Sequence, residues 1–198
     1  LGDRRQRQMC IRDRAVTTPA HKQAFATAIQ GAPYFRAVMG RDLALWADNP
    51  GAPVRLFTLP GAALTLNGST AQLCGTPQDW EELLSFLQFA GIAHLIAEET
   101  PLLPAAAGEP LFLYSMPPQD RLPLAQEHQG YMLNRSPPVL RLATQLFPQE
   151  PERQDCYYSE TCTALAHGFA RVLALQDAAG RLVSTVGAYA MANGEAYM

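Results

Sequence analysis

The chain has 198 residues, enough for one or two domains, and its 48% hydrophobic and 9% aromatic residues can form a buried core. Fifteen basic and eighteen acidic residues give a net charge of −3, and Lys22 is the one lysine, so no basic stripe could hold a nucleic-acid backbone. No apolar run approaches the roughly 18 residues of a membrane span, and the N-terminus lacks the apolar stretch of a signal peptide. We therefore expect a cytoplasmic protein without nucleic-acid or membrane partners.

Residues 1–14 contain five arginines and show no hydrophobic periodicity. The hexapeptide Met9-Cys10-Ile11-Arg12-Asp13-Arg14 resembles the translated end of a transposon used to build sequencing libraries. We expect residues 1–14 to be an artefact without ordered structure and exclude them from the fold. The alternative is a basic arm for anionic partners. Without this segment, ten basic and sixteen acidic residues remain, which is a net charge of −6.

Residues 15–116 are predicted to form a first α+β unit. Its expected elements are two helices within 18–47, strands at 54–59, 62–66 and 70–74, a helix at 77–90, and strands at 92–97 and 111–116. Pro60-Gly61 and Asn67-Gly68 predict the turns of an antiparallel meander, the second with positive φ at both residues. Thr76 is the expected N-cap of the helix, and Gly91 its end. We expect a mixed sheet in this unit.

A polar stretch at residues 117–137 is predicted to be a linker, because Gln, Asp, Glu and His replace the apolar residues there. Beyond it, the expected elements are helices at 139–147 and 153–166 and strands at 169–175 and 182–191, followed by a turn at Asn193-Gly194 into a strand that is cut short. We expect the second unit, residues 138–198, to be an antiparallel meander under two helices, and the chain to be a fragment of a longer protein.

The segments His167–Leu175 and Gly180–Ala188 resemble the first hairpin of a GNAT-family N-acetyltransferase of the bacterial two-part type. In that family a short acidic-glycine turn joins two such strands. The resemblance covers residues 138–198, and residues 15–116 resemble the degenerate GNAT-like half that precedes the enzyme unit in such proteins. It implies a GNAT-like α+β fold in which residues 138–198 are the N-terminal half of a truncated acetyltransferase domain.

The family holds the pyrophosphate of acetyl-CoA with a loop of the pattern Q/R-x-x-G-x-G/A between the fourth strand and the next helix. The second half stops before such a loop, and the junction Cys74-Gly75-Thr76-Pro77-Gln78 of the first half has one glycine and a proline that lacks an N–H. The resemblance therefore implies that the intact parent transfers an acetyl group from acetyl-CoA to an amine substrate, while this chain has no cofactor-binding residue and is inactive. The alternative is a non-catalytic GNAT-like module that binds a ligand or a protein.

Three tyrosines are the candidate substrate-binding residues. Tyr157, Tyr158 and Tyr189 could line an amine-substrate cleft between the second helix and the meander of residues 138–198, because each offers an apolar face and one hydroxyl; packing in the core is the alternative. No catalytic residue can be assigned. The histidines are far apart and no cysteines form a C-x-x-C pair, so we expect no metal site.

Overall fold

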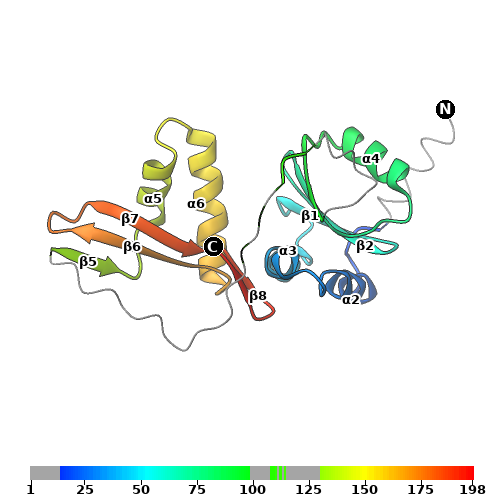
Figure 1. Cartoon of the computed structure of the whole chain (residues 1–198), viewed down its shortest axis with the longest axis horizontal. Helices are drawn as coiled ribbons and strands as arrows, with labels where there is room; N and C mark the ends of the chain where they lie inside the picture. Colours follow the sequence, from blue (N-terminus) through cyan, green and yellow to red (C-terminus); the bar gives the residue numbers. More distant parts are fainter. Residues whose placement is uncertain (1–13, 99–107, 111, 113, 115–129) are drawn as a thin grey trace. The chain divides into compact units, whose positions relative to one another are not determined.

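The computed structural model describes residues 14–98, 108–110, 112, 114 and 130–198 (Figure 1). Contacts between Cα atoms divide the chain into two units, Leu1–Glu109 with Ala192–Glu195 and Pro110–Met191 with Ala196–Met198. Up to residue 98 the elements are α2 (Pro19–Ala28), α3 (Pro33–Trp46), β1 (Val54–Leu59), β2 (Ala62–Asn67), β3 (Thr70–Gly75), α4 (Trp80–Phe89) and β4 (His94–Ala97). From residue 130 they are β5 (Tyr131–Asn134), α5 (Val139–Leu146), α6 (Pro151–Ala166), β6 (Arg171–Asp177), β7 (Leu182–Ala188), β8 (Ala190–Ala192) and β9 (Glu195–Tyr197). The fold class is α+β.

The first unit contains a mixed four-stranded sheet in the order β1-β2-β3-β4. The first three strands form the predicted antiparallel meander, and α4 connects β3 to β4, which run parallel with Thr70 opposite His94. A parallel pair needs such a crossover because the chain must return to the same end of the sheet. The prediction of a mixed sheet in this unit is confirmed.

Helices cover both faces of this sheet (Figure 1). On one face, Phe25 and Ile29 from the α2 segment and Met39 from α3 are completely buried. On the other face, Leu83 and Phe86 of α4 are buried against the strands. Because both faces are covered, β2 is buried along almost its whole length, which explains its apolar sequence.

The turns of the meander differ in one case from the prediction. Pro60-Gly61 is the expected two-residue turn, with Gly61 at φ 82°. The next turn is Gly68-Ser69, because Asn67 still pairs with Thr70, and Gly68 is the one residue of that turn with positive φ. A turn with positive φ at its first central residue alone is of type II′. Because the turn is formed by Gly68 and Ser69, the prediction of an Asn67-Gly68 turn was wrong by one residue.

The start of α4 is also corrected by the structure. Asp79, not Thr76, is the N-cap: its carboxylate accepts a hydrogen bond of 2.8 Å from the backbone N–H of Glu82. Aspartate and threonine are both favoured at the N-cap, so the residue type alone did not distinguish Asp79 from Thr76. Gly91 ends the helix as predicted, with φ 73° and with the N–H of Ile92 donating to the carbonyl of Leu87 over 3.0 Å.

Two predictions concern the borders of the first unit, namely the excluded segment 1–14 and the strand at 111–116. Arg14, which we assigned to the excluded segment, accepts a 3.0 Å hydrogen bond from the N–H of Thr58 through its carbonyl, so pairing with the edge of β1 begins there. Backbone pairing of this kind depends little on the side chain, and composition could not reveal it. The strand expected at 111–116 lies outside the described residues except for Phe112 and Tyr114, which are exposed and have no strand assignment.

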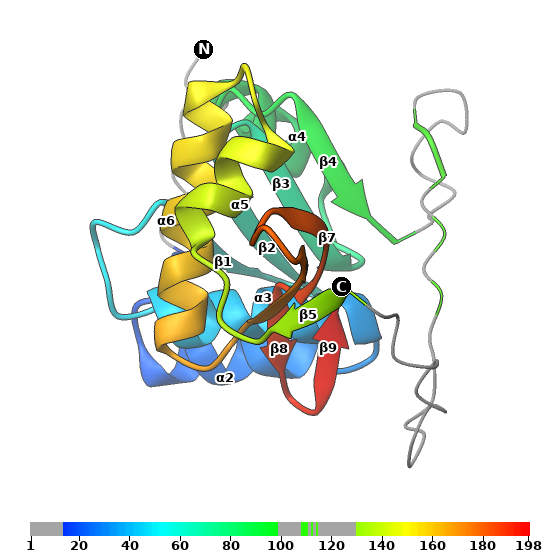
Figure 2. The ribbon, with the colours of Figure 1, turned by 90° about the vertical axis from the view of Figure 1, so that its left-hand side faces the viewer.

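The second unit contains an antiparallel sheet in the order β5-β6-β7. Its first strand, β5, lies inside the predicted linker 117–137, so that prediction was wrong for residues 131–134; residues 117–129 are outside the described part of the chain. The strand β5 has four residues, which pair with Ala174–Asp177. Four residues are too few to show an alternating pattern in the sequence. The two helices α5 and α6 were predicted correctly and run side by side (Figure 2).

The two helices pack on one face of the second sheet. The buried core there consists of Leu142 from α5 with Val172, Ala174 and Leu182 from the strands. Along each strand the intervening side chains point to the opposite face. That face carries Tyr131, Leu133 and Val186, which are 50%, 52% and 54% exposed, and the half-buried Leu173 and Leu175. The open face of the second sheet is therefore apolar.

The chain closes with the short hairpin β8–β9 (Figure 2). Its turn is Asn193-Gly194, as predicted, with φ of 53° and 80°. Positive φ at both central residues is the signature of a type I′ turn, which Asn-Gly favours.

Candidate functional site

Two of the three predicted substrate-binding tyrosines contact each other. Tyr157 lies on α6, and Tyr189 lies between β7 and β8. Their hydroxyl oxygens are 3.1 Å apart, so one hydroxyl donates to the other, and their rings meet edge to face with centroids 5.9 Å apart. Both rings pack against the core formed by Leu142, Val172, Ala174 and Leu182. The structure thus brings together side chains separated by 32 residues in the sequence.

Tyr158 does not join this pair. Successive residues on a helix point about 100° apart, so Tyr157 and Tyr158 cannot face the same neighbours. Tyr158 is 44% exposed, whereas Tyr157 is half-buried. Among the described residues, Tyr157 is the tyrosine of α6 whose ring contacts other rings, those of Phe147 and Tyr189, and whose hydroxyl bonds to that of Tyr189. Of the three predicted residues, Tyr157 and Tyr189 therefore lie together, and Tyr158 lies apart from them.

An aromatic neighbour extends the pair in a way that sequence reasoning missed. The Phe147 ring lies 5.7 Å from that of Tyr157, and the guanidinium carbon of Arg153 lies 4.5 Å from the centre of the Phe147 ring. Arg153 also forms a 2.8 Å ion pair with Glu150. A cation over an aromatic face is a favourable electrostatic contact. Nothing in the spacing of Phe147 and Tyr157 along the chain signals their proximity, because they lie on either side of the turn between two helices.

The environment of Tyr157 keeps its hydroxyl protonated. Burial raises the pKa of Tyr157 well above its usual range, and the hydrogen bond with Tyr189 raises it further. A hydroxyl of this kind is a hydrogen-bond donor and acceptor at neutral pH and not a general base. Tyr157 can therefore orient a polar group but does not provide the deprotonation that an amine nucleophile needs.

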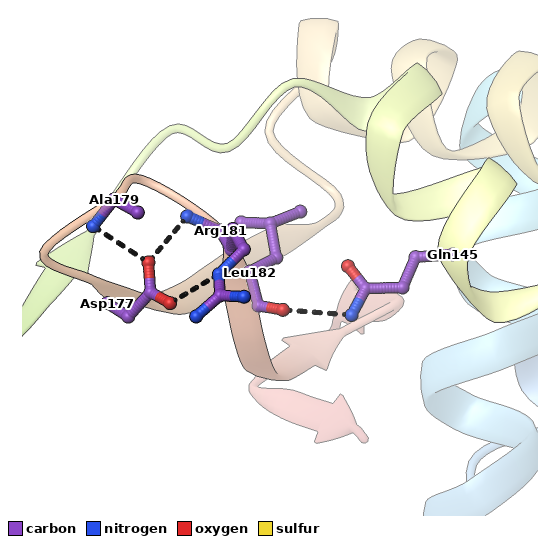
Figure 3. Close-up of polar contacts among 5 residues, drawn as sticks. All are labelled: Gln145, Asp177, Ala179, Arg181 and Leu182. Carbon is purple, nitrogen blue, oxygen red and sulfur yellow. Dashed lines mark hydrogen bonds and ion pairs between the residues drawn. The ribbon is translucent and has the colours of Figure 1, made fainter.

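The loop of the β6–β7 hairpin is held by side chains (Figure 3). The carboxylate of Asp177 accepts hydrogen bonds from the backbone N–H groups of Ala179 and Arg181 at 3.0 and 2.9 Å. At the start of β7, the Nε2 of Gln145 donates to the carbonyl of Leu182 at 2.9 Å, which ties α5 to the strand. The Asp-x-x-Gly spacing of this loop was a usable sequence signal, since aspartate commonly bonds the backbone two residues later.

The junction that would correspond to a cofactor loop in the first unit carries a carboxylate. Asp79 occupies the N-terminus of α4, where an anion would otherwise meet free N–H groups. Gln88–Ala93 contains the letters Q-x-x-G-x-A, but it lies where α4 ends and the chain enters β4. A helix C-terminus presents carbonyl groups and a partial negative charge, which repel a phosphate. The first segment joins a strand to a helix but has a carboxylate at the helix N-terminus, and the second segment lacks the strand-to-helix context of a phosphate-binding loop.

Among the residues that the structure describes, the remaining reactive side chains do not form a second site. Within the described ranges, no three histidine, cysteine, aspartate or glutamate residues come close enough to hold a metal ion. Burial and the nearby Glu98 carboxylate raise the pKa of the Cys74 thiol to about 12, so this thiol is unreactive at neutral pH. His167 is the C-cap residue of α6, and its Nδ1 lies 2.9 Å from the carbonyl of Thr163.

No protein-family model, curated protein or solved structure matches this chain. In the part of the chain that the structure describes, no helix combines the length and the apolar character needed to cross a bilayer.

Proposed function

We propose that the chain is part of an acetyl-CoA-dependent N-acetyltransferase of the GNAT family that acts on a small-molecule or peptide amine. Two helices followed by antiparallel strands in the second unit support this proposal, because the hairpin motif at 167–188 resembles that family and the family has this order. The single observation that carries it is that the strands of this motif do pair, with Leu173 opposite Val186, around a loop closed by Asp177.

In the proposed reaction, the amine nitrogen attacks the thioester carbonyl of acetyl-CoA, a C–N bond forms, the C–S bond breaks, and coenzyme A leaves as a thiol. The amine must first lose a proton to a base or a water chain. Tyr157 and Tyr189 are proposed to orient the amine substrate, with Tyr158 on the neighbouring helix surface. The first unit would serve as a scaffold, because the carboxylate of Asp79 occupies the junction between β3 and α4, where a cofactor loop would lie. A cytoplasmic location is part of the proposal, since Cys74, Cys156 and Cys162 are free thiols.

The competing proposal is a non-catalytic GNAT-like module that binds a ligand or a protein. The half-buried tyrosine pair favours it, because the pair supplies hydrogen bonds without a base. The two proposals differ in acetyl-CoA binding, which the module would lack.

The test compares the 198-residue chain with the same chain extended through the codons that follow Met198 in its gene. We expect the extension to encode R-x-x-G-x-G and to bind acetyl-CoA in a calorimetric titration, and to release coenzyme A thiol when amines are supplied. The 198-residue chain should do neither, and an extended variant with both glycines changed to alanine is the matched control. An extension without that loop, or one that does not bind acetyl-CoA, would exclude the enzyme and leave the binding module.

A further inference from the structure

Gly187 lies on the side of β7 that faces the helices. It is paired with Val172 of β6, whose side chain is buried in the core under α5 and α6. Directly paired residues of neighbouring strands place their side chains on the same face. Gly187 itself is buried, so any side chain at this position would enter the packed interior.

The space beside Gly187 is filled by Tyr189. A Cβ atom added to Gly187 would lie 2.7 Å from Cζ, 2.9 Å from the hydroxyl oxygen and 3.0 Å from Cε2 of the Tyr189 ring. Tyr189 follows directly after the end of β7, and its ring lies back over the glycine. Gly187 is not among the glycines with positive φ, so its backbone conformation is open to other residues. What excludes a side chain here is the ring of Tyr189.

We propose that Gly187 is a positioning residue for Tyr189: because it has no side chain, the Tyr189 ring can lie over β7 and bring its hydroxyl to that of Tyr157. A larger residue at position 187 would clash with the far end of the Tyr189 ring. The ring would therefore move, and the backbone of β7 would keep its place. A moved ring separates the two hydroxyls, which are now 3.1 Å apart. The inference concerns the geometry of the tyrosine pair and does not depend on acetyl transfer.

The hydroxyl pair can be followed by NMR on protein labelled with ¹³C at the Cζ atoms of tyrosine, with the Tyr157 signal assigned from Tyr157→Phe. In the native chain the Tyr157 signal should not shift at pH values near 10, where ordinary tyrosines ionise. In Gly187→Ala it should shift at lower pH than in the native chain. Gly31→Ala is the matched control, since Gly31 has open space around it and no positive φ, and it should leave the Tyr157 signal unchanged.

Two further variants separate positioning from a general loss of packing. Tyr189→Phe keeps the ring over Gly187 but removes its hydroxyl, and it should lower the titration midpoint of Tyr157 as Gly187→Ala does. In a Tyr189→Ala background, adding Gly187→Ala should change neither that midpoint nor the denaturation midpoint. The proposal is wrong if Gly187→Ala leaves the Tyr157 titration unaltered, or if it costs as much stability without the Tyr189 ring as with it.

Discussion

Arg181 donates to the carboxylate of Asp177 twice, from its backbone N–H at 2.9 Å and from its Nε at 2.7 Å (Figure 3). These bonds favour the ionised carboxylate and lower the pKa of Asp177. A lowered folded-state pKa stabilises the fold above the unfolded value, near pH ~4, and this stabilisation is lost as the pH falls through the folded value. The hairpin loop therefore depends on a charged aspartate.

Asp177→Ala should lower the thermal midpoint of the second unit at pH 6, and the difference from the native chain should shrink as the pH falls below about 4. The reason is that the native chain loses the charged acceptor in that range, whereas the variant never had it. Thermal unfolding followed by circular dichroism from pH 6 to pH 2 measures this. Asp155→Asn, an exposed change on α6, is the control and should leave the thermal midpoint at pH 6 unchanged. A constant difference at all pH values would contradict the prediction.

Gly75→Ala should destabilise the first unit more than Gly91→Ala does. Both glycines have positive φ, at 87° and 73°, so both changes carry a backbone cost of about 1 to 2 kcal/mol. A Cβ at Gly75 would in addition lie 2.5 Å from the carbonyl oxygen of Gly61, whereas at Gly91 it would meet open space. Urea denaturation of the two variants measures the difference. Equal losses would show that the backbone around Gly61 can yield.

Asp79→Ala should cost about 1 kcal/mol of unfolding free energy, because it removes the acceptor for the N–H of Glu82 at the start of α4. Thr76→Ala is the matched control, since Thr76 is exposed and lies outside the helix, and it should change stability by less than about 0.5 kcal/mol. Chemical denaturation at neutral pH measures both. The reverse order of effects would restore Thr76 as the cap.

Leu83→Ala should cost about 2 to 5 kcal/mol, because Leu83 is 1% exposed in the core between α4 and the first sheet and its loss leaves a cavity. The neighbouring Leu84 is 48% exposed, so Leu84→Ala should cost far less. The comparison uses two adjacent leucines of one helix and so holds helix propensity constant. Similar losses for the two variants would show that α4 is rotated relative to the structure described.

Val186→Lys should reduce self-association of the chain, because it places a charge on the apolar open face of the second sheet, opposite Leu173. Leu140→Lys on α5 is the control: Leu140 is 58% exposed and Val186 is 54% exposed, so the two changes add the same charge at equally accessible positions. Light scattering as a function of concentration compares the variants with the native chain. An equal improvement for both would mean that net charge, and not this face, controls solubility.

Local chemistry in the sequence was enough to predict most elements of both units. The positive φ values of Gly61, Gly91 and Gly180 follow from the lack of a Cβ, and the Asn193-Gly194 turn follows from the same preference. The apolar stripe of α4 places its buried residues, Leu83, Phe86 and Leu87, at helical spacing. These signals act over a few residues, so they can be recognised without knowing what each element packs against.

Choices between equally good local alternatives were decided by tertiary structure. Thr76 and Asp79 are both good helix caps, and the one used depends on where the chain leaves β3. Tyr131–Asn134 is too short to be recognised as a strand, and its pairing with β6, some forty residues later, makes it one.

In the candidate site, too, local sequence predicted the residue types and tertiary structure decided the contacts. The sequence indicated tyrosines on a helix and near the end of a strand, and it identified the residue types that can orient a polar group. The contact between Tyr157 and Tyr189, its extension to Phe147, and the part played by Gly187 depend on packing between α6 and β7. A sequence pattern records the preferences of each segment for its own conformation, whereas a contact between distant segments depends on how their surfaces fit, and that fit exists only once the chain is folded.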